Sequence, residues 1–317
     1  KNEISLMVTR VTDLANNRLI QSLIFNAQDK IQDRQLQLST MQKSQDYAGI
    51  AKEASKLLSA EASEHRIDQF LNDNSTVNLR MDATLNSIDF LKNSLNDARG
   101  LVREILDDGN LPDGMDKDDI SATKMSEIQD FLNVKINGRY LFSGSMTSTQ
   151  PVTPNAFGTA PTFDSSYETE AEPAYYYKGD DTQIKARISE NVTLDYGVNA
   201  DDPGFEKLIR AVRIIRETAL NDANASEKFN HALALLNESE DRLQAIELNI
   251  GVKVEQLART NEGLTSTKNS LGAVITDIEQ ANTFEAVAEL TQTQTMLEAS
   301  YNTVVRLSDL TLNSFLR

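Results

Sequence analysis

The sequence lacks cysteine and tryptophan, and it contains only two histidines. Without cysteine there is no disulfide, no thiol nucleophile and no thiolate metal ligand. His65 and His231 do not belong to an H-E-x-x-H metal motif, and the sequence has no P-loop, no dinucleotide fingerprint and no G-x-S-x-G segment. These absences predict a protein that is not an enzyme and that uses no catalytic residues, no metal and no cofactor.

Positive charge and long apolar runs are also scarce. The 317 residues include 31 Lys and Arg against 48 Asp and Glu, which gives a formal net charge of -17. Nucleic acids and anionic membranes are polyanions, so this charge argues against binding to either. No apolar run approaches the length of a transmembrane helix, and the N-terminus lacks the apolar block of a signal peptide. We therefore expect no nucleic-acid partner and no membrane insertion.

Proline is absent from residues 1–111 and 204–317, and these two arms carry helical patterns. Residues 281–317 place their apolar side chains three, four or seven positions apart, which puts them on one face of a helix. Residues 1–45 carry a similar pattern after a short lead-in at residues 1–10 that is expected to be extended. Residues 53–106 keep one face of a long helix apolar, and residues 229–278 carry an apolar stripe that alternates steps of three and four, which is typical of a coiled coil.

The segment between the two arms has a different composition. Five of the six prolines lie in residues 151–205. Period-two alternation at residues 184–188 and 192–196 predicts two β-strands. A third helix is expected at residues 118–137, with Gly138 as its C-cap. The three tyrosines at 175–177 are interpreted as core and cross-strand packing rather than a ligand-binding patch.

The predicted architecture is mainly α. Two helical arms form a long antiparallel coiled-coil rod, and a small β-rich outer domain is inserted between them. Each chain end then carries an amphipathic helix whose apolar stripe needs a partner, because burial of such a stripe supplies most of the stability of a helix. The expected domains are a terminal helix and loop (1–52), an outgoing rod (53–138), a β-rich domain (139–203), a returning rod (204–280) and a C-terminal helix (281–317).

Several segments resemble the bacterial flagellin family. Residues 137–145, NGRYLFSGS, are similar to the NGRYLFSG segment that follows the third helix in that family. Residues 281–317 resemble the flagellin C-terminal helix, with Leu297-Glu298-Ala299-Ser300-Tyr301 at its centre, and Arg10-Val11-Thr12 resembles the family's N-terminal motif. Residues 39–52 depart from the family, which usually has a Ser-Gly-Lys/Arg turn and an Asp-Asp-Pro there. The resemblance covers nearly the whole chain.

The resemblance implies a structural protein that is exported by the flagellar secretion system without a cleaved signal and lies outside the cell, in the flagellum. Its expected role is a filament subunit that polymerises for swimming motility. The alternative within the family is a hook-associated junction protein that connects hook to filament, which the small size of the β-rich segment favours. A third possibility, from another class, is an adhesin whose outer domain binds a ligand. The implied partners are further copies of the chain, hook-associated and cap proteins, and an export chaperone.

The resemblance also implies an assembly surface on the terminal helices. Apolar residues of both ends are expected to pack around the axis of a polymer, where terminal helices of many copies cover one another's apolar faces. The alternative to an assembly surface is that these residues are merely the core of a single-chain helical bundle. The residues expected at this assembly surface are Ile24, Ile31, Leu38, Val287, Leu290, Leu297, Tyr301, Val304 and Phe315.

Overall fold

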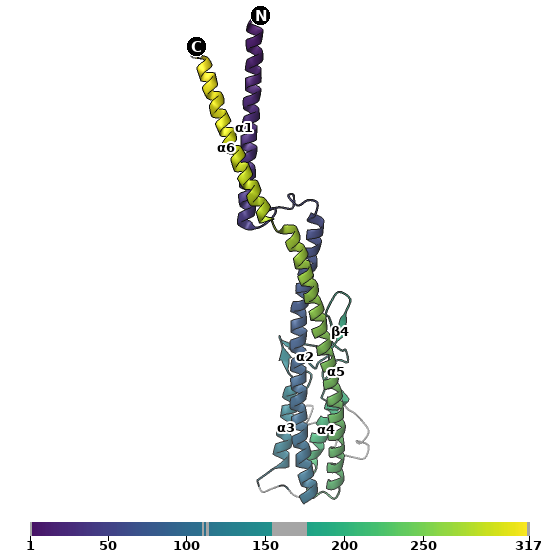
Figure 1. Cartoon of the computed structure of the whole chain (residues 1–317). Coiled ribbons are helices and arrows are strands. Elements are labelled where there is room, and N and C mark those ends of the chain that lie inside the picture. Colours follow the sequence, from purple (N-terminus) through teal and green to yellow (C-terminus); the bar gives the residue numbers. More distant parts are fainter. Residues whose placement is uncertain (1, 110, 112–113, 154–175, 316–317) are drawn as a thin grey trace. The chain divides into compact units, whose positions relative to one another are not determined.

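The computed structural model describes residues 2–109, 111, 114–153 and 176–315, and the side chains of residues 18–306 within these ranges (Figure 1). The chain is mainly α with a small β part, as the sequence predicts. Its described helices are α1 (Asn2–Thr40), α2 (Ala54–Asp108), α3 (Lys117–Leu132), α4 (Pro203–Glu217), α5 (Ala225–Glu279) and α6 (Thr283–Phe315). Its described strands are β1 (Lys135–Ile136), β2 (Arg139–Tyr140), β3 (Lys185–Arg187) and β4 (Thr193–Asp195).

The chain forms two compact units. One unit combines residues 1–65 with residues 267–317, and it contains α1 and α6. The other unit comprises residues 66–266, and it contains α3, α4, the strands and most of α2 and α5. None of the helices in the described part of the chain is both long and apolar enough to cross a membrane.

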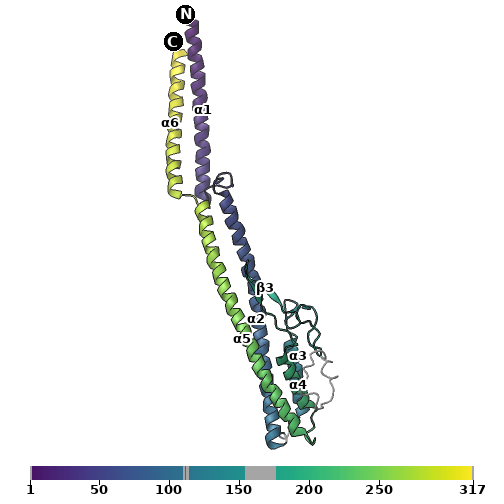
Figure 2. The same ribbon diagram turned by 90° about the vertical axis from the view of Figure 1, so that its right-hand side faces the viewer.

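In the unit formed by residues 66–266, α2 and α5 run antiparallel and side by side (Figures 1 and 2). Polar contacts between the two helices fix their register. Lys92 Nζ lies 2.8 Å from Glu247 Oε2, Arg99 pairs with Glu240, and Asn74 Nδ2 donates to Asn261 Oδ1 over 2.7 Å. Between them lies the apolar seam that the sequence predicts, with the buried side chains Val77, Met81, Ile88, Leu91, Leu95, Val102, Phe229, Leu236, Leu243, Ile250 and Leu257.

The helices α3 and α4 add a second layer to this core. Asp116 accepts a hydrogen bond from the backbone N–H of Asp118 and so caps the N-terminus of α3. Asp202 does the same for α4, where Pro203 occupies the first turn. Lys117 is only 9% exposed, and its Nζ donates to the Arg216 carbonyl at the end of α4 over 2.9 Å. This bond joins the start of α3 to the end of α4.

The β part consists of two short hairpins. In β3–β4, Ala186 pairs with Leu194, which matches the predicted alternation. In β1–β2, Ile136 pairs with Arg139, so Asn137 and Gly138 form a two-residue loop. The expectation that Gly138 caps a helix ending at residue 137 was therefore wrong, because α3 ends at Leu132 and the chain turns as a hairpin instead. Asn-Gly is the dipeptide that a type I′ hairpin loop favours, since both residues take positive φ.

Two further expectations concern the tyrosines and the first residues. Tyr176 is 2% exposed and belongs to the core, as predicted, and its hydroxyl donates to the Ala200 carbonyl. Tyr175 lies outside the described residues. The lead-in expected to be extended is helical, because α1 already begins at Asn2.

Candidate assembly surface

The pair formed by α1 and α6 is the largest feature of its unit (Figures 1 and 2). The two helices are antiparallel and in contact. The sequence places Ile24, Ile31 and Leu38 seven residues apart, so they share one face of α1. Leu290 and Leu297 repeat the same step on α6. All five side chains are half-buried, so this unit contains a seam rather than a closed core.

Polar contacts across the seam set the register of the pair. Arg34 Nε lies 2.7 Å from Glu289 Oε2, with both side chains partly exposed. Gln28 Nε2 donates to the Tyr301 hydroxyl over 3.1 Å. Because exposed ion pairs are worth little on their own, these contacts align the helices more than they stabilise them.

Backbone hydrogen bonds hold the end of α1 against the short link between α5 and α6. The Lys43 N–H donates to the Glu279 carbonyl over 2.6 Å, and the Ala281 N–H donates to the Met41 carbonyl over 2.9 Å. Met41 sits at the turn with a positive φ of 57°, a conformation that is uncommon for a non-glycine residue. The two terminal helices are thus joined by main-chain bonds at one end of the pair.

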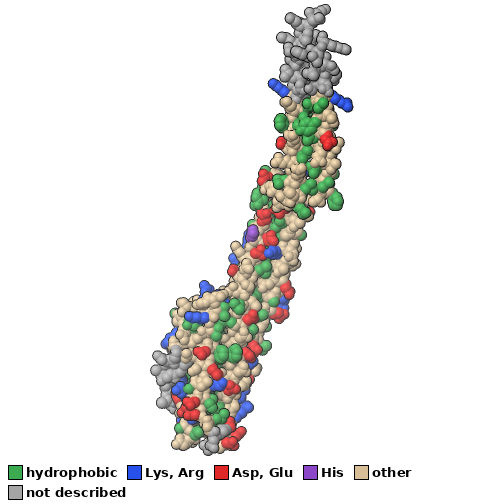
Figure 3. Space-filling model, turned by 90° about the vertical axis from the view of Figure 1, so that its left-hand side faces the viewer, with side chains coloured by type: hydrophobic (Ala, Val, Ile, Leu, Met, Phe, Trp, Pro, Cys, Tyr) green, Lys and Arg blue, Asp and Glu red, His purple; other side chains and the backbone are tan. Residues whose placement is uncertain are grey.

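The pair buries few apolar side chains. Among the described side chains of α1 none is fully buried, and among those of α6 only Ala286 is, at 3% exposure. Large apolar side chains lie on the surface of the pair instead, where Figure 3 shows hydrophobic groups. Phe284 is 89% exposed and Phe25 is 65% exposed. The other large exposed apolar residues of the two helices are Leu19, Leu23, Leu36, Val287, Met296, Tyr301, Val304 and Val305.

This distribution has a physical consequence. Clusters of large exposed apolar side chains are uncommon on monomeric proteins, and they indicate candidate interaction sites. A long helix that buries only part of its apolar surface is also weakly stabilised. The α1–α6 pair is therefore a candidate interaction surface.

The residues expected at the assembly surface fall into two groups. Ile24, Ile31, Leu38, Leu290 and Leu297 are the half-buried seam described above. Val287, Tyr301 and Val304 are exposed, at 50%, 45% and 38%. Phe315 is the last residue of α6, and its side chain lies outside the described residues.

Four exposed apolar residues of α1 were not among those expected: Leu19, Leu23, Phe25 and Leu36. They lie off the seam face, so a search for one apolar stripe passes over them. A search for a second apolar face could have found two of them. Phe25 and Leu36 are eleven residues apart, about three helical turns, so they share a face of α1 that is not the seam face. A helix with apolar residues on more than one face indicates more than one neighbour.

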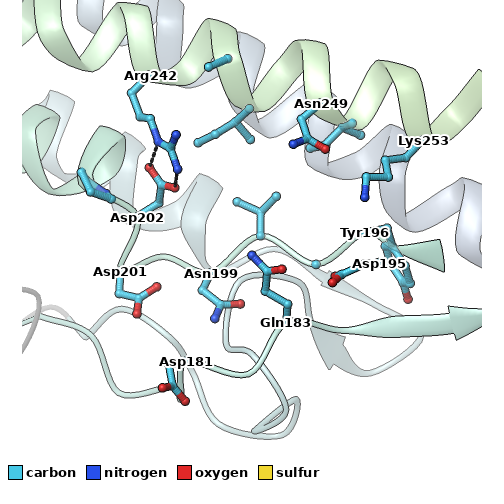
Figure 4. Close-up of a pocket in the computed structure, with 16 residues that line it drawn as sticks. Asp181, Gln183, Asp195, Tyr196, Asn199, Asp201, Asp202, Arg242, Asn249 and Lys253 are labelled. Carbon is cyan, nitrogen blue, oxygen red and sulfur yellow. Dashed lines mark hydrogen bonds and ion pairs between the residues drawn. The ribbon is translucent and has the colours of Figure 1, made fainter. Parts of the chain in front are cut away.

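The unit of residues 66–266, called the second unit below, holds a polar cavity of about 370 Å³. The helix α5 lies on one side of it and the loops around β4 lie on the other (Figure 4). Arg242 from α5 forms an ion pair of 2.8 Å with Asp202. Burial raises the pKa of the nearby Asp201 carboxyl, and the charge of Asp202 raises it further. The described residues contain no group of three or more His, Cys, Asp or Glu side chains that could hold a metal ion.

Comparison with known proteins gives structural matches only. No model of a known protein family matches the chain, and no curated protein matches it. Among solved structures, a proposed flagellar hook-associated protein of Vibrio parahaemolyticus superposes with a TM-score of 0.57 at 15% identity, over 74% of this chain and 99% of that one. The chain therefore shares its fold with that protein.

Two further solved structures are similar at a lower level. FlgL of Bacillus cereus has a TM-score of 0.49 at 14% identity, over 65% of this chain and 98% of its own. The flagellar hook-associated protein 3 of Legionella pneumophila has a TM-score of 0.44 at 12% identity, over 74% of this chain and 99% of its own.

Proposed function

We propose that this chain is a structural subunit of the bacterial flagellum that assembles side by side with further copies through α1 and α6. The observation that carries the proposal is the apolar surface of this pair, where Phe284, Phe25 and Val287 are exposed while the seam between the helices is only half-buried. Packing against the same helices of neighbouring copies would remove this surface from water. At about 25 cal/mol per Å² of buried apolar area, such burial drives association.

A hook-associated role is the form of this proposal that the fold likeness favours. The Vibrio protein with which the chain shares its fold is described as hook-associated, and 99% of its length is matched. On this view the chain connects the hook to the filament and forms only a short zone. The segment NGRYLFSGS and the C-terminal helix, which resemble flagellins, support the filament subunit as the second candidate.

The location and partners follow from the same role. The chain would leave the cell through the flagellar secretion channel. Outside the cell it would contact other hook-associated and cap proteins. Before secretion it would bind an export chaperone. Exposed apolar helices are an aggregation hazard for a free subunit. A chaperone that covers α1 and α6 until assembly would remove that hazard.

Elongation of seeds distinguishes the two roles. Purified subunit is mixed with short pieces of native flagella and examined by electron microscopy. Long filaments built from this chain alone would exclude the junction role. A short addition that stops, together with a deletion strain that sheds its filaments into the medium, is the result expected for a junction protein. No addition to either hook or filament ends would contradict both.

Charge substitution on α6 tests the surface itself. Phe284→Asp and Val304→Asp place a carboxylate on exposed apolar positions, so the subunit should still fold and should fail to assemble, because burying an unpaired charge is costly. Thr295→Asp is the matched control, since Thr295 is an exposed residue of the same helix outside the apolar set. Normal assembly of the two apolar variants would refute the assigned surface.

A further inference from the structure

The tip of the β1–β2 hairpin is chemically distinctive. It is formed by Asn137 and Gly138, the only Asn-Gly dipeptide in the sequence. Both residues adopt positive φ angles, 52° and 76°, as a two-residue type I′ loop requires. Both are exposed, and the position that a Cβ would take on Gly138 has no atom within 4 Å. The side chain and the following peptide bond are thus open to water.

The backbone amide of Gly138 is the second feature. Among the described residues no carbonyl accepts a hydrogen bond from it, because the loop directs its pairing bonds through the flanking Ile136 and Arg139. An asparagine side chain is attacked at Cγ by the nitrogen of the next residue. The attack is easiest when that nitrogen makes no hydrogen bond and when the next residue is glycine, which has no Cβ in the way.

Other asparagines of the same chain lie in α-helices, which protect them from this attack. Asn86 and Asn93 in α2 and Asn269 in α5 are each followed by serine, and all three side chains are exposed. In an α-helix the amide of each following residue donates to the carbonyl four positions earlier. Attack at these asparagines requires the helix to open locally first, so only a small fraction of the molecules can react at any moment.

We propose that Asn137 is a site of spontaneous deamidation in the folded protein. The Gly138 nitrogen forms a bond to Cγ of Asn137, the Cγ–Nδ2 bond breaks, and ammonia leaves with the proton from the Gly138 amide. The product is a five-membered succinimide. Water then adds to one of its two carbonyls and breaks a carbon–nitrogen bond of the ring, giving aspartate or isoaspartate. No oxidant, reductant or enzyme takes part.

The isoaspartate product changes the hairpin. Its backbone runs through the side-chain carbon, which adds one methylene to a loop whose geometry allows two residues. The pairing of Lys135 with Tyr140 then shifts out of register. The contact in which Lys135 Nζ lies 4.2 Å from the centre of the Tyr140 ring is lost as well. Either product also adds a negative charge beside Lys135 and Arg139. A subunit that ages outside the cell would therefore acquire a local lesion at this hairpin.

Peptide mapping of the full-length protein tests the proposal. The protein is incubated in warm, mildly alkaline buffer, and peptides are followed by chromatography and mass spectrometry. The peptide with Asn137 is expected to gain the small mass of an amide-to-acid exchange and to split into two peaks, for aspartate and isoaspartate. The change should be faster than at Asn86, Asn93 and Asn269 by on the order of tenfold or more, since helical amides must open first.

Two comparisons keep the test decisive. Asn137→Gln replaces the five-membered ring closure by a slower six-membered one, so the modification should disappear from that peptide while the other three sites keep their rates. The three helical asparagines serve as internal standards in every sample, and unchanged rates at these sites also show that the helices of the variant are intact. Reaction at Asn137 that is no faster than at these standards would overturn the proposal.

Discussion

Gly144 illustrates how one residue allows two loops of the unit of residues 66–266 to meet. It belongs to the segment NGRYLFSGS, is buried, and has a φ of 66°. A Cβ at this position would lie 2.6 Å from the Asp180 carbonyl oxygen and 3.1 Å from that of Thr182. The next residue, Ser145, donates both its backbone N–H and its hydroxyl to the Asp180 carboxylate. The close approach of these two loops therefore requires glycine.

Gly144→Ala should destabilise this unit by about 1–3 kcal/mol, because alanine is strained at positive φ and its methyl group meets backbone atoms. Chemical denaturation of the variant provides the measurement. Gly251→Ala is the matched control, since Gly251 lies within α5 with no atom within 4 Å of the added methyl. That change should stabilise the protein by about 0.5–1 kcal/mol. Equal effects of the two substitutions would contradict the assigned role.

Asp201 gives the stability of the second unit a pH dependence. Burial raises the pKa of its carboxyl above the ordinary value of 3.8, and the charges of Asp202, Asp181 and Asp180 raise it further. The ionised form is thus less favourable in the folded state than in the unfolded chain. Above the raised pKa this destabilisation is fully present, and below the ordinary value it is absent.

Asp201→Asn should therefore raise the melting temperature at neutral pH. The gain should shrink as the pH falls through the raised pKa toward 3.8, because the natural carboxyl is then protonated in both states. Thermal unfolding at several pH values measures the difference. A stabilisation that is constant over the whole range would show that loss of charge is not its cause.

At the scale of elements, the long helices were predictable because their apolar periodicity is repeated over many turns. The seam of α2 and α5 follows from spacing alone, and so does the existence of the strands β3 and β4, although not the pairing of Ala186 with Leu194. The end of α3 was not predictable in the same way. Gly138 can end a helix or turn a hairpin, and the choice depends on Asn137 taking positive φ as well.

The exposed surface of α1 and α6 shows a different limit of sequence reasoning. Periodicity placed Leu297 and Val304 on one face of α6, and it could not tell which of them another helix of the same chain would cover. Leu297 is half-buried, whereas Val304 is 38% exposed. The difference depends on where α1 lies around α6, a tertiary property that no local pattern encodes. The assembly surface therefore stays a prediction from shape and chemistry.

This distinction gives an element-scale prediction. Leu297→Asp places a charge in the half-buried seam, so it should weaken the contact between α1 and α6 in the free subunit as well as block assembly. Val304→Asp should block assembly with little change in the helical content of the subunit. Circular dichroism of the two monomers separates the effects. Equal helicity of both variants and the natural chain would contradict the placement of Leu297.

At the scale of the whole molecule, the two units differ in how they are stabilised. The unit of residues 66–266 has a continuous core that includes Phe142 and Phe205, whose rings meet edge to face at 5.7 Å. The unit that contains α1 and α6 buries few apolar side chains. Since burial of apolar surface is the main favourable term in folding, the unit of residues 66–266 should be much the more stable of the two in the free subunit.

Hydrogen exchange before and after assembly tests the central claim most directly. In the free subunit, amides of α1 and α6 should exchange much faster than the core amides of α2 and α5, because local opening costs less there. In the polymer, the amides of α1 and α6 should become protected while those of α2 and α5 change little. Protection of α1 and α6 that is already complete in the free subunit and unchanged by assembly would contradict the account.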